Sequence, residues 1–177
     1  MPTEWGKWFV ERISELEERL GYILELNQVR ELWLQGELYL MSTDDQQLNL
    51  NVRDIIAGGS VDFVGESPKM IAELKVCGRG YYSKMLNGFS LTEDVASKKS
   101  FSFEDMACHS EAEGSIFKDF CRLFSANSAY EKYMIIVIPK IQGPDRLSEV
   151  LEAAKFPGVE VSRRLQWFDV RVFCLPK

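Results

Sequence analysis

The chain has 177 residues, of which 46% are hydrophobic and 27% charged, and its formal net charge is −6. This composition predicts one soluble globular domain with a sizeable core, and it carries no signature of disorder. The acidic balance argues against a protein that coats nucleic acid non-specifically, because such binding rests on neutralising phosphates. It leaves room for a local basic groove.

Several other classes of protein are disfavoured by what the sequence lacks. No apolar run approaches the roughly 20 residues that span a bilayer, and residues 1–7 lack the basic start and apolar stretch of a signal peptide. The four cysteines have no paired spacing, which is typical of reduced thiols, so we expect a cytoplasmic protein outside the membrane. His109 is the only histidine, and Cys108 precedes it directly. Adjacent side chains point apart, which disfavours a catalytic dyad or a zinc site there.

The hydrophobic pattern predicts helices and strands that alternate along the chain. A helix over about 3–21 is amphipathic, and a second over about 27–41 is apolar on most sides, so we expect it to be deeply packed. The run 133–138 has the pattern of a central strand buried on both faces. The other elements, in chain order, are strands at about 47–56, 60–64 and 69–77, helices near 81–86, at about 110–126 and after Pro144, and strands at 159–162 and 165–175. This order predicts an α/β architecture with a mixed sheet.

The most informative segment is the hairpin predicted from strands 60–64 and 69–77, joined by the polar loop 65–68. Side chains alternate between the two faces of a strand. Glu73 and Lys75 therefore share one face of the second strand, opposite its run of apolar residues.

The pairing register decides whether an acid of the first strand joins them. A four-residue loop pairs Val64 with Lys69 and Asp62 with Ile71, which puts Asp62 on the face of the charged pair. A register that differs by two residues keeps this arrangement, and a slip of one residue destroys it. The sequence thus predicts two carboxylates and one ammonium on a single patch of sheet.

This arrangement resembles the PD-(D/E)xK nuclease superfamily, which has the restriction-endonuclease-like fold. The resemblance implies an α-β-β-β-α-β core in one domain, extended by the N-terminal helix at about 3–21 and the C-terminal strands at about 159–175. Asp62 matches the family's acid on the second strand, and Glu73-Leu74-Lys75 matches its acid-any-lysine motif on the third. Glu37 matches a glutamate that many members carry on the preceding helix. Val61 stands where the motif name has proline, which is a common departure.

The resemblance implies metal-dependent hydrolysis of phosphodiester bonds. Mg²⁺ or Mn²⁺ prefers hard oxygen ligands, which Asp62, Glu73 and the backbone carbonyl of Leu74 supply. Glu37 is expected to bind through water or to hold a second ion. Lys75 is expected to orient the attacking water and to stabilise developing negative charge.

The nucleic-acid partner implied by the family is DNA ahead of RNA, and a homodimer is compatible, since many relatives dimerise to cut two strands. Arg79, Tyr81, Tyr82 and Lys84 follow the third strand and are candidates for contacts with the backbone and bases. Lys84 also lies where some members carry a further polar residue. A tyrosine pair in this place is more often part of the packing.

Alternative interpretations stay open from the residues alone. The hairpin can be half-exposed, with Lys75 in an ion pair to Asp62 or Glu73, and Glu37 can pair with Arg30 or another neighbour. A catalytically silent member of the fold, acting as a protein-interaction or dimerisation module, also fits the acidic balance.

Overall fold

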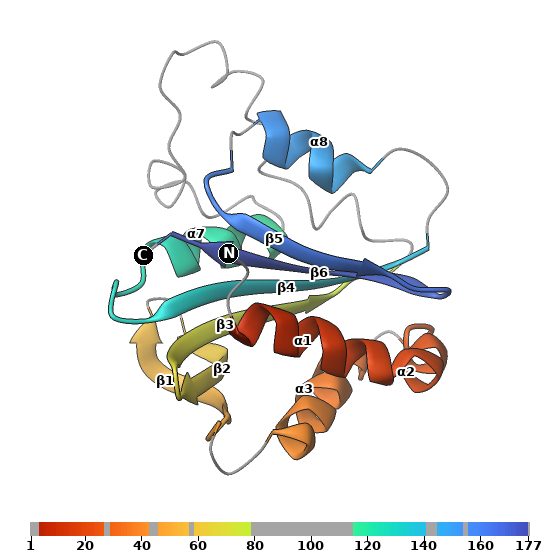
Figure 1. Ribbon diagram of the computed structural model, residues 1–177, viewed down its shortest axis with the longest axis horizontal. Helices are drawn as coiled ribbons and strands as arrows, with labels where there is room; N and C mark the ends of the chain where they lie inside the picture. Colours follow the sequence, from red (N-terminus) through yellow and green to blue (C-terminus); the bar gives the residue numbers. More distant parts are fainter. Residues whose placement is uncertain are drawn as a thin grey trace.

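The structure, a computed structural model, describes residues 4–26, 29–42, 46–56, 59–78, 115–140, 145–153 and 156–176. Within these ranges a six-stranded mixed sheet carries helices on both faces (Figure 1), which confirms the predicted α/β class. The helices are α1 (Glu4–Glu15), α2 (Glu17–Ile23), α3 (Arg30–Met41), α7 (Ser115–Phe124) and α8 (Arg146–Ala153). None of these helices is long and apolar enough to cross a bilayer. The strands are β1 (Asn49–Ile56), β2 (Gly59–Glu66), β3 (Lys69–Val76), β4 (Glu131–Pro139), β5 (Val159–Arg164) and β6 (Phe168–Leu175).

The strands follow the order β1-β2-β3-β4-β6-β5 across the sheet. β1, β2 and β3 form an antiparallel meander, whereas β4 comes after α7 in the chain and lies parallel to β3. β6 pairs antiparallel with β4, and β5 pairs antiparallel with β6. From α3 to β4 the described elements therefore run helix, three strands, helix and strand.

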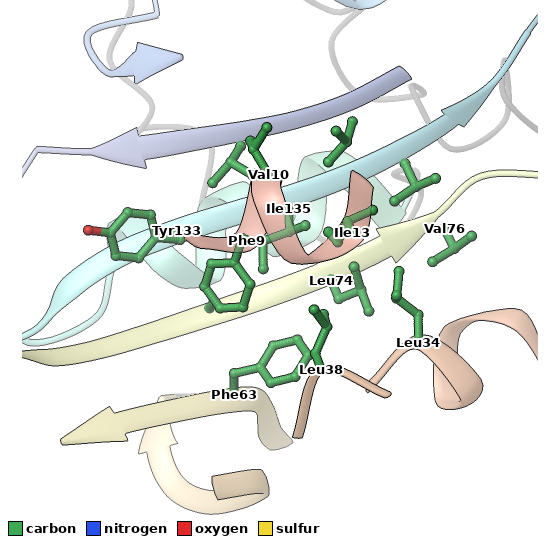
Figure 2. Packing of buried hydrophobic residues seen from close by; sticks show 14 of the residues in the cluster. Phe9, Val10, Ile13, Leu34, Leu38, Phe63, Leu74, Val76, Tyr133 and Ile135 are labelled. Atoms are coloured by element: carbon green, nitrogen blue, oxygen red, sulfur yellow. The ribbon is translucent and has the colours of Figure 1, made fainter. Parts of the chain in front are cut away.

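Two layers of core sandwich the sheet. Helices α1 and α3 cover one face, where Phe9, Leu34 and Leu38 are fully buried against the strands (Figures 1 and 2). Helices α7 and α8 cover the other face, where Phe120 is buried among residues of the sheet. Strand β4 runs between the layers with residues 132–139 all buried, which confirms the prediction of a central strand.

The N-terminal helix is interrupted. The segment predicted as one helix over 3–21 forms α1 and α2, which are separated by Leu16. The amide of Leu16 donates to the carbonyl of Ile13 at 3.1 Å, a closure over three residues that tightens the turn. Leu16 and Leu20 remain buried, so the apolar stripe continues toward the core across the break.

Helix α3 departs from the expectation of deep packing. Only Leu34, Gln35 and Leu38 are buried, because the helix lies on the sheet with a single face. The opposite face exposes the apolar residues Val29 (46%), Leu32 (65%), Tyr39 (49%) and Leu40 (78%). Gly36 lies along this exposed face, and a side chain added there would meet nothing within 4 Å. A helix that is apolar on most of its sides thus buries one face and leaves apolar side chains of the opposite face in water.

Candidate functional site

Strands β2 and β3 separate partway along their length. Their pairing runs from Glu66–Lys69 to Phe63–Ala72, and residues 59–62 of β2 then stay paired with β1. The gap between residues 59–62 of β2 and 73–76 of β3 is called the notch below. Backbone groups of β3 that face the notch need partners other than β2.

Side chains supply those partners. The amide of Leu74 donates to Asp62 Oδ2 at 2.7 Å, and the amide of Val76 donates to Glu31 Oε2 at 3.2 Å. Arg30 Nε donates to the carbonyl of Val76 at 2.9 Å. The amide and carbonyl of one strand residue point to the same edge, so the Leu74 carbonyl also faces the notch. Acidic side chains thus replace the backbone of β2 at this point of the sheet.

The predicted parity of the hairpin is confirmed, although the predicted loop length was wrong. The turn is the two residues Ser67 and Pro68, and Val64 pairs with Ile71. This register differs by two residues from the one expected, and such a shift leaves every side chain on its face. Asp62 lies one residue beyond the last of these pairs, and its carboxylate lies next to that of Glu73.

Asp62 is fixed by donors on both carboxylate oxygens. Besides the Leu74 amide on Oδ2, Gln35 Nε2 donates to Oδ1 at 2.9 Å. Asn51 Nδ2 in turn donates to Gln35 Oε1 at 3.3 Å. The backbone of Asn51 has a φ of 50°, a conformation that asparagine adopts more readily than most residues. A helix and two neighbouring strands therefore set the orientation of this one carboxylate.

Glu73 is the most deeply buried acid of the site, with 2% of its surface exposed. Arg122 Nη1 lies 2.9 Å from its Oε1, but the contact is not aligned as a hydrogen bond, and Oε1 has no hydrogen-bond donor among the described residues. Burial, followed by the neighbouring charges of Asp119 and Asp62, raises the pKa of Glu73 to about 9, and Arg122 offsets this only in part. The surroundings of Glu73 therefore favour its protonated form at neutral pH.

Lys75 is held between carboxylates from both helical layers. Its Nζ lies 3.1 Å from Asp119 Oδ2 on α7 and 3.5 Å from Glu31 Oε1 on α3. Burial lowers the pKa of Lys75, but the charges of Asp119 and Glu31 outweigh it, so the pKa lies above its usual value. Burial is also the main cause that raises the pKa values of Asp119 and Glu31. Lys75 therefore stays charged at neutral pH.

These groups form a charged cluster around the notch. It contains four carboxylates and two basic groups, namely Glu31, Asp62, Glu73, Asp119, Lys75 and Arg122. When all six are ionised, two negative charges are in excess, and Arg30, whose Nε donates to the Val76 carbonyl at the same notch, reduces this excess to one. Buried like charges repel strongly unless a cation or a proton neutralises them, so the site is suited to take up either.

The structure brings three of the predicted site residues together and leaves Glu37 elsewhere. Asp62, Glu73 and Lys75 meet at the notch, whereas the carboxylate of Glu37 pairs with Arg19 at 2.6 Å and 3.1 Å. Glu31 and Gln35 are four residues apart and share the helix face turned to the notch. Glu37 is two residues further on and points away from that face, so the acid contributed by α3 is Glu31.

Three residues of the cluster were not predicted, namely Glu31 on α3 and Asp119 and Arg122 on α7. The sequence predicted a helix in the segment of α7 but no site residue on it. Asp119 and Arg122 lie one turn apart on α7. Their i, i+3 spacing places both on one helix face, which is the signal that points to them. The candidates Arg79, Tyr81, Tyr82 and Lys84 lie outside the described residues.

The donor atoms of the cluster suit Mg²⁺ or Mn²⁺, which prefer carboxylate and carbonyl oxygens. The side chain that most lacks a donor, Glu73, lies beside Asp62 and near the Leu74 carbonyl. Within the described ranges no three metal-binding side chains converge on one point. In the same cluster Lys75 bridges Asp119 and Glu31, and Arg122 bridges Glu73 and Asp119.

A separate cavity of about 390 Å³ lies between α8 and strands β5 and β6. Its lining includes Arg171, which is already held by Glu160 at 2.8 Å and Asp145 at 3.1 Å. None of its lining residues belongs to the charged cluster. The concentration of buried charge, and not this cavity, marks the candidate site.

Comparisons of the chain with protein-family models, with curated proteins and with solved structures gave no match. The function is therefore inferred from the residues of the site.

Proposed function

We propose that this chain is a divalent-metal-dependent nuclease with a restriction-endonuclease-like fold, and that it hydrolyses phosphodiester bonds in nucleic acid. One observation carries the proposal. Asp62 and Glu73 lie side by side on neighbouring strands that have parted, with Lys75 on the same face and a buried excess of negative charge. The element order from α3 to β4 supports the same fold.

The acids of the notch have distinct roles in this proposal. Asp62 and Glu73, with the Leu74 carbonyl, hold Mg²⁺ or Mn²⁺, and Glu31 contributes through water from its anchored position on the Val76 amide. When bound, the cation supplies positive charge for the phosphate oxygens and makes a water more acidic. The carboxylate of Asp62 is oriented before the cation binds, because Gln35 and the Leu74 amide donate hydrogen bonds to it.

Lys75 orients the attacking water and stabilises charge that develops on the phosphate. Its raised pKa keeps the ammonium protonated at neutral pH, so it acts as a donor and not as a general base. Asp119 and Glu31 hold it from two sides, which limits its freedom before substrate arrives. DNA is the first substrate to test, and RNA the second.

The proposal is tested by incubating single- and double-stranded DNA and RNA with the purified chain and Mn²⁺ or Mg²⁺. We expect cleavage that EDTA abolishes and that Asp62→Asn lowers by roughly 100-fold or more, because the amide cannot replace the ligand charge. Asp169→Asn is the matched control, since Asp169 lies on β6 outside the cluster and pairs with Lys140. Robust cleavage by Asp62→Asn contradicts the proposal.

A second candidate, a silent member of the fold that acts as an interaction module, is favoured by the exposed face of α3. Val29, Leu32 and Leu40 expose apolar surface of a kind that marks protein contacts. The ion pairs that already fill the notch also fit a site that no longer binds metal. A chain that binds no divalent cation, cleaves no substrate and self-associates through this face matches the second candidate.

A further inference from the structure

Arg122 is the basic group closest to Glu73 in the charged cluster. Its Nη1 lies 2.9 Å from Glu73 Oε1 and 3.6 Å from Asp119 Oδ1, while Nη2 donates to the Ser60 carbonyl at 2.6 Å. The guanidinium therefore connects α7, β3 and the separated end of β2. It stands against the acid on which the proposed metal site depends.

The fit between Arg122 and these acids is incomplete. An arginine that pairs with a carboxylate by two parallel hydrogen bonds satisfies both oxygens. Here one nitrogen is shared between Glu73 and Asp119, which are 2% and 7% exposed. Glu73 Oε1 lacks an aligned donor among the described residues, whereas Asp119 Oδ2 lies 3.1 Å from Lys75 Nζ. Arg122 thus supplies charge to the buried acids without saturating their hydrogen-bonding capacity.

A small divalent cation would satisfy such oxygens better than a shared guanidinium nitrogen. It carries twice the charge and accepts lone pairs from several directions. Both cations cannot lie against Glu73 together, because like charges at contact distance repel. Lys75 does not compete in this way, since it forms its ion pairs with Asp119 and Glu31.

We infer that Arg122 is an internal counter-ion that occupies the cation's place at Glu73 in the metal-free protein and competes with the divalent ion for it. The inference rests on the proposed function, which assigns the cation to Asp62 and Glu73. Arg122 leaves Glu73 when the cation binds and keeps its anchor on the Ser60 carbonyl. It therefore lowers the affinity of the wild-type site for metal.

The test is calorimetric titration of Mn²⁺ alone into wild type and Arg122→Gln. We expect the variant to bind Mn²⁺ about tenfold more tightly or better, because the competing charge is gone. Arg12→Gln is the control for the change in net charge, since Arg12 pairs with Glu11 and Glu15 on α1. Binding by Arg122→Gln that equals or falls below that of wild type overturns the inference while the metal site of the proposed function stands.

Two further outcomes separate the inference from the proposed function. Binding by Arg122→Gln but not by wild type supports the inference and contradicts a working metal site in the natural chain. An absence of binding in both proteins overturns both. If Arg122→Gln is unfolded without metal, we expect millimolar Mn²⁺ to restore its circular dichroism spectrum, because an ion that binds only the folded state stabilises it. A spectrum that stays unfolded overturns the inference.

Discussion

Lys75→Met is expected to lower cleavage by roughly 100-fold or more and to destabilise the protein by about 3–5 kcal/mol. The two effects have different origins. Cleavage falls because the ammonium no longer faces the water and the phosphate. Stability falls because Asp119 and Glu31 lose their shared cation in a buried place, where Lys75 approaches them to 3.1 Å and 3.5 Å.

A second substitution separates these effects. Lys75→Met leaves the buried negative charge of Asp119 without its cation. Adding Asp119→Asn removes that charge as well, so we expect much of the lost stability to return. Cleavage is expected to stay low in the double variant. Urea unfolding measures the stabilities, and Lys69→Met, at the exposed start of the same strand, is the matched control. Full activity in Lys75→Met, or a loss of stability that Asp119→Asn does not relieve, contradicts these roles.

Glu73→Gln is expected to abolish cleavage and yet to stabilise the metal-free protein at neutral pH. The folded state raises the pKa of Glu73 from its ordinary value of 4.5 to about 9. Between these values the folded protein binds a proton that the unfolded chain has released, so the stability of wild type falls as the pH rises through that window. Glutamine does not titrate, so its stability does not fall with pH in this way. Its amide imitates the protonated acid by donating to Asp62.

The stability difference between Glu73→Gln and wild type should therefore grow from pH 4.5 to pH 9 and reach about 3 kcal/mol at pH 7. Urea unfolding in EDTA across this range measures it. Glu37→Gln is the control, because it removes a carboxylate of the Arg19 ion pair and should change stability by less than about 1 kcal/mol. A Glu73→Gln variant that is less stable than wild type at pH 8 contradicts the raised pKa.

The patch at the notch was predictable from sequence because strand parity is robust. The loop of the hairpin was predicted two residues too long, yet the paired residues keep their faces, since only an odd shift exchanges them, and Asp62 still lies next to Glu73. β4 was likewise predictable, because a strand buried on both sides has a continuous apolar run. Local periodicity was sufficient in both places.

The sequence did not predict which face of α3 meets the sheet, and predictions that depended on that face were wrong. Glu37 and Glu31 both lie on α3, and only its orientation on the sheet directs Glu31 to the notch and Glu37 to Arg19. An apolar pattern on most sides gave no preferred face, so the exposed surface at Leu32 and Leu40 was not foreseen. Asp119 comes from a distant helix, and the parallel β3–β4 connection that brings it to Lys75 is a tertiary feature.

Calorimetric titration of Mn²⁺ into EDTA-treated and dialysed protein at pH 7.5 shows whether Asp62 and Glu73 form a divalent-cation site. We expect one site that disappears in Asp62→Ala. We also expect the release of close to one proton per cation, detected by comparing buffers with different ionisation enthalpies, because the pKa of Glu73 is about 9 before the ion binds. No binding up to about 10 mM, or binding by Asp62→Ala equal to that of wild type, contradicts a divalent-cation site at Asp62 and Glu73.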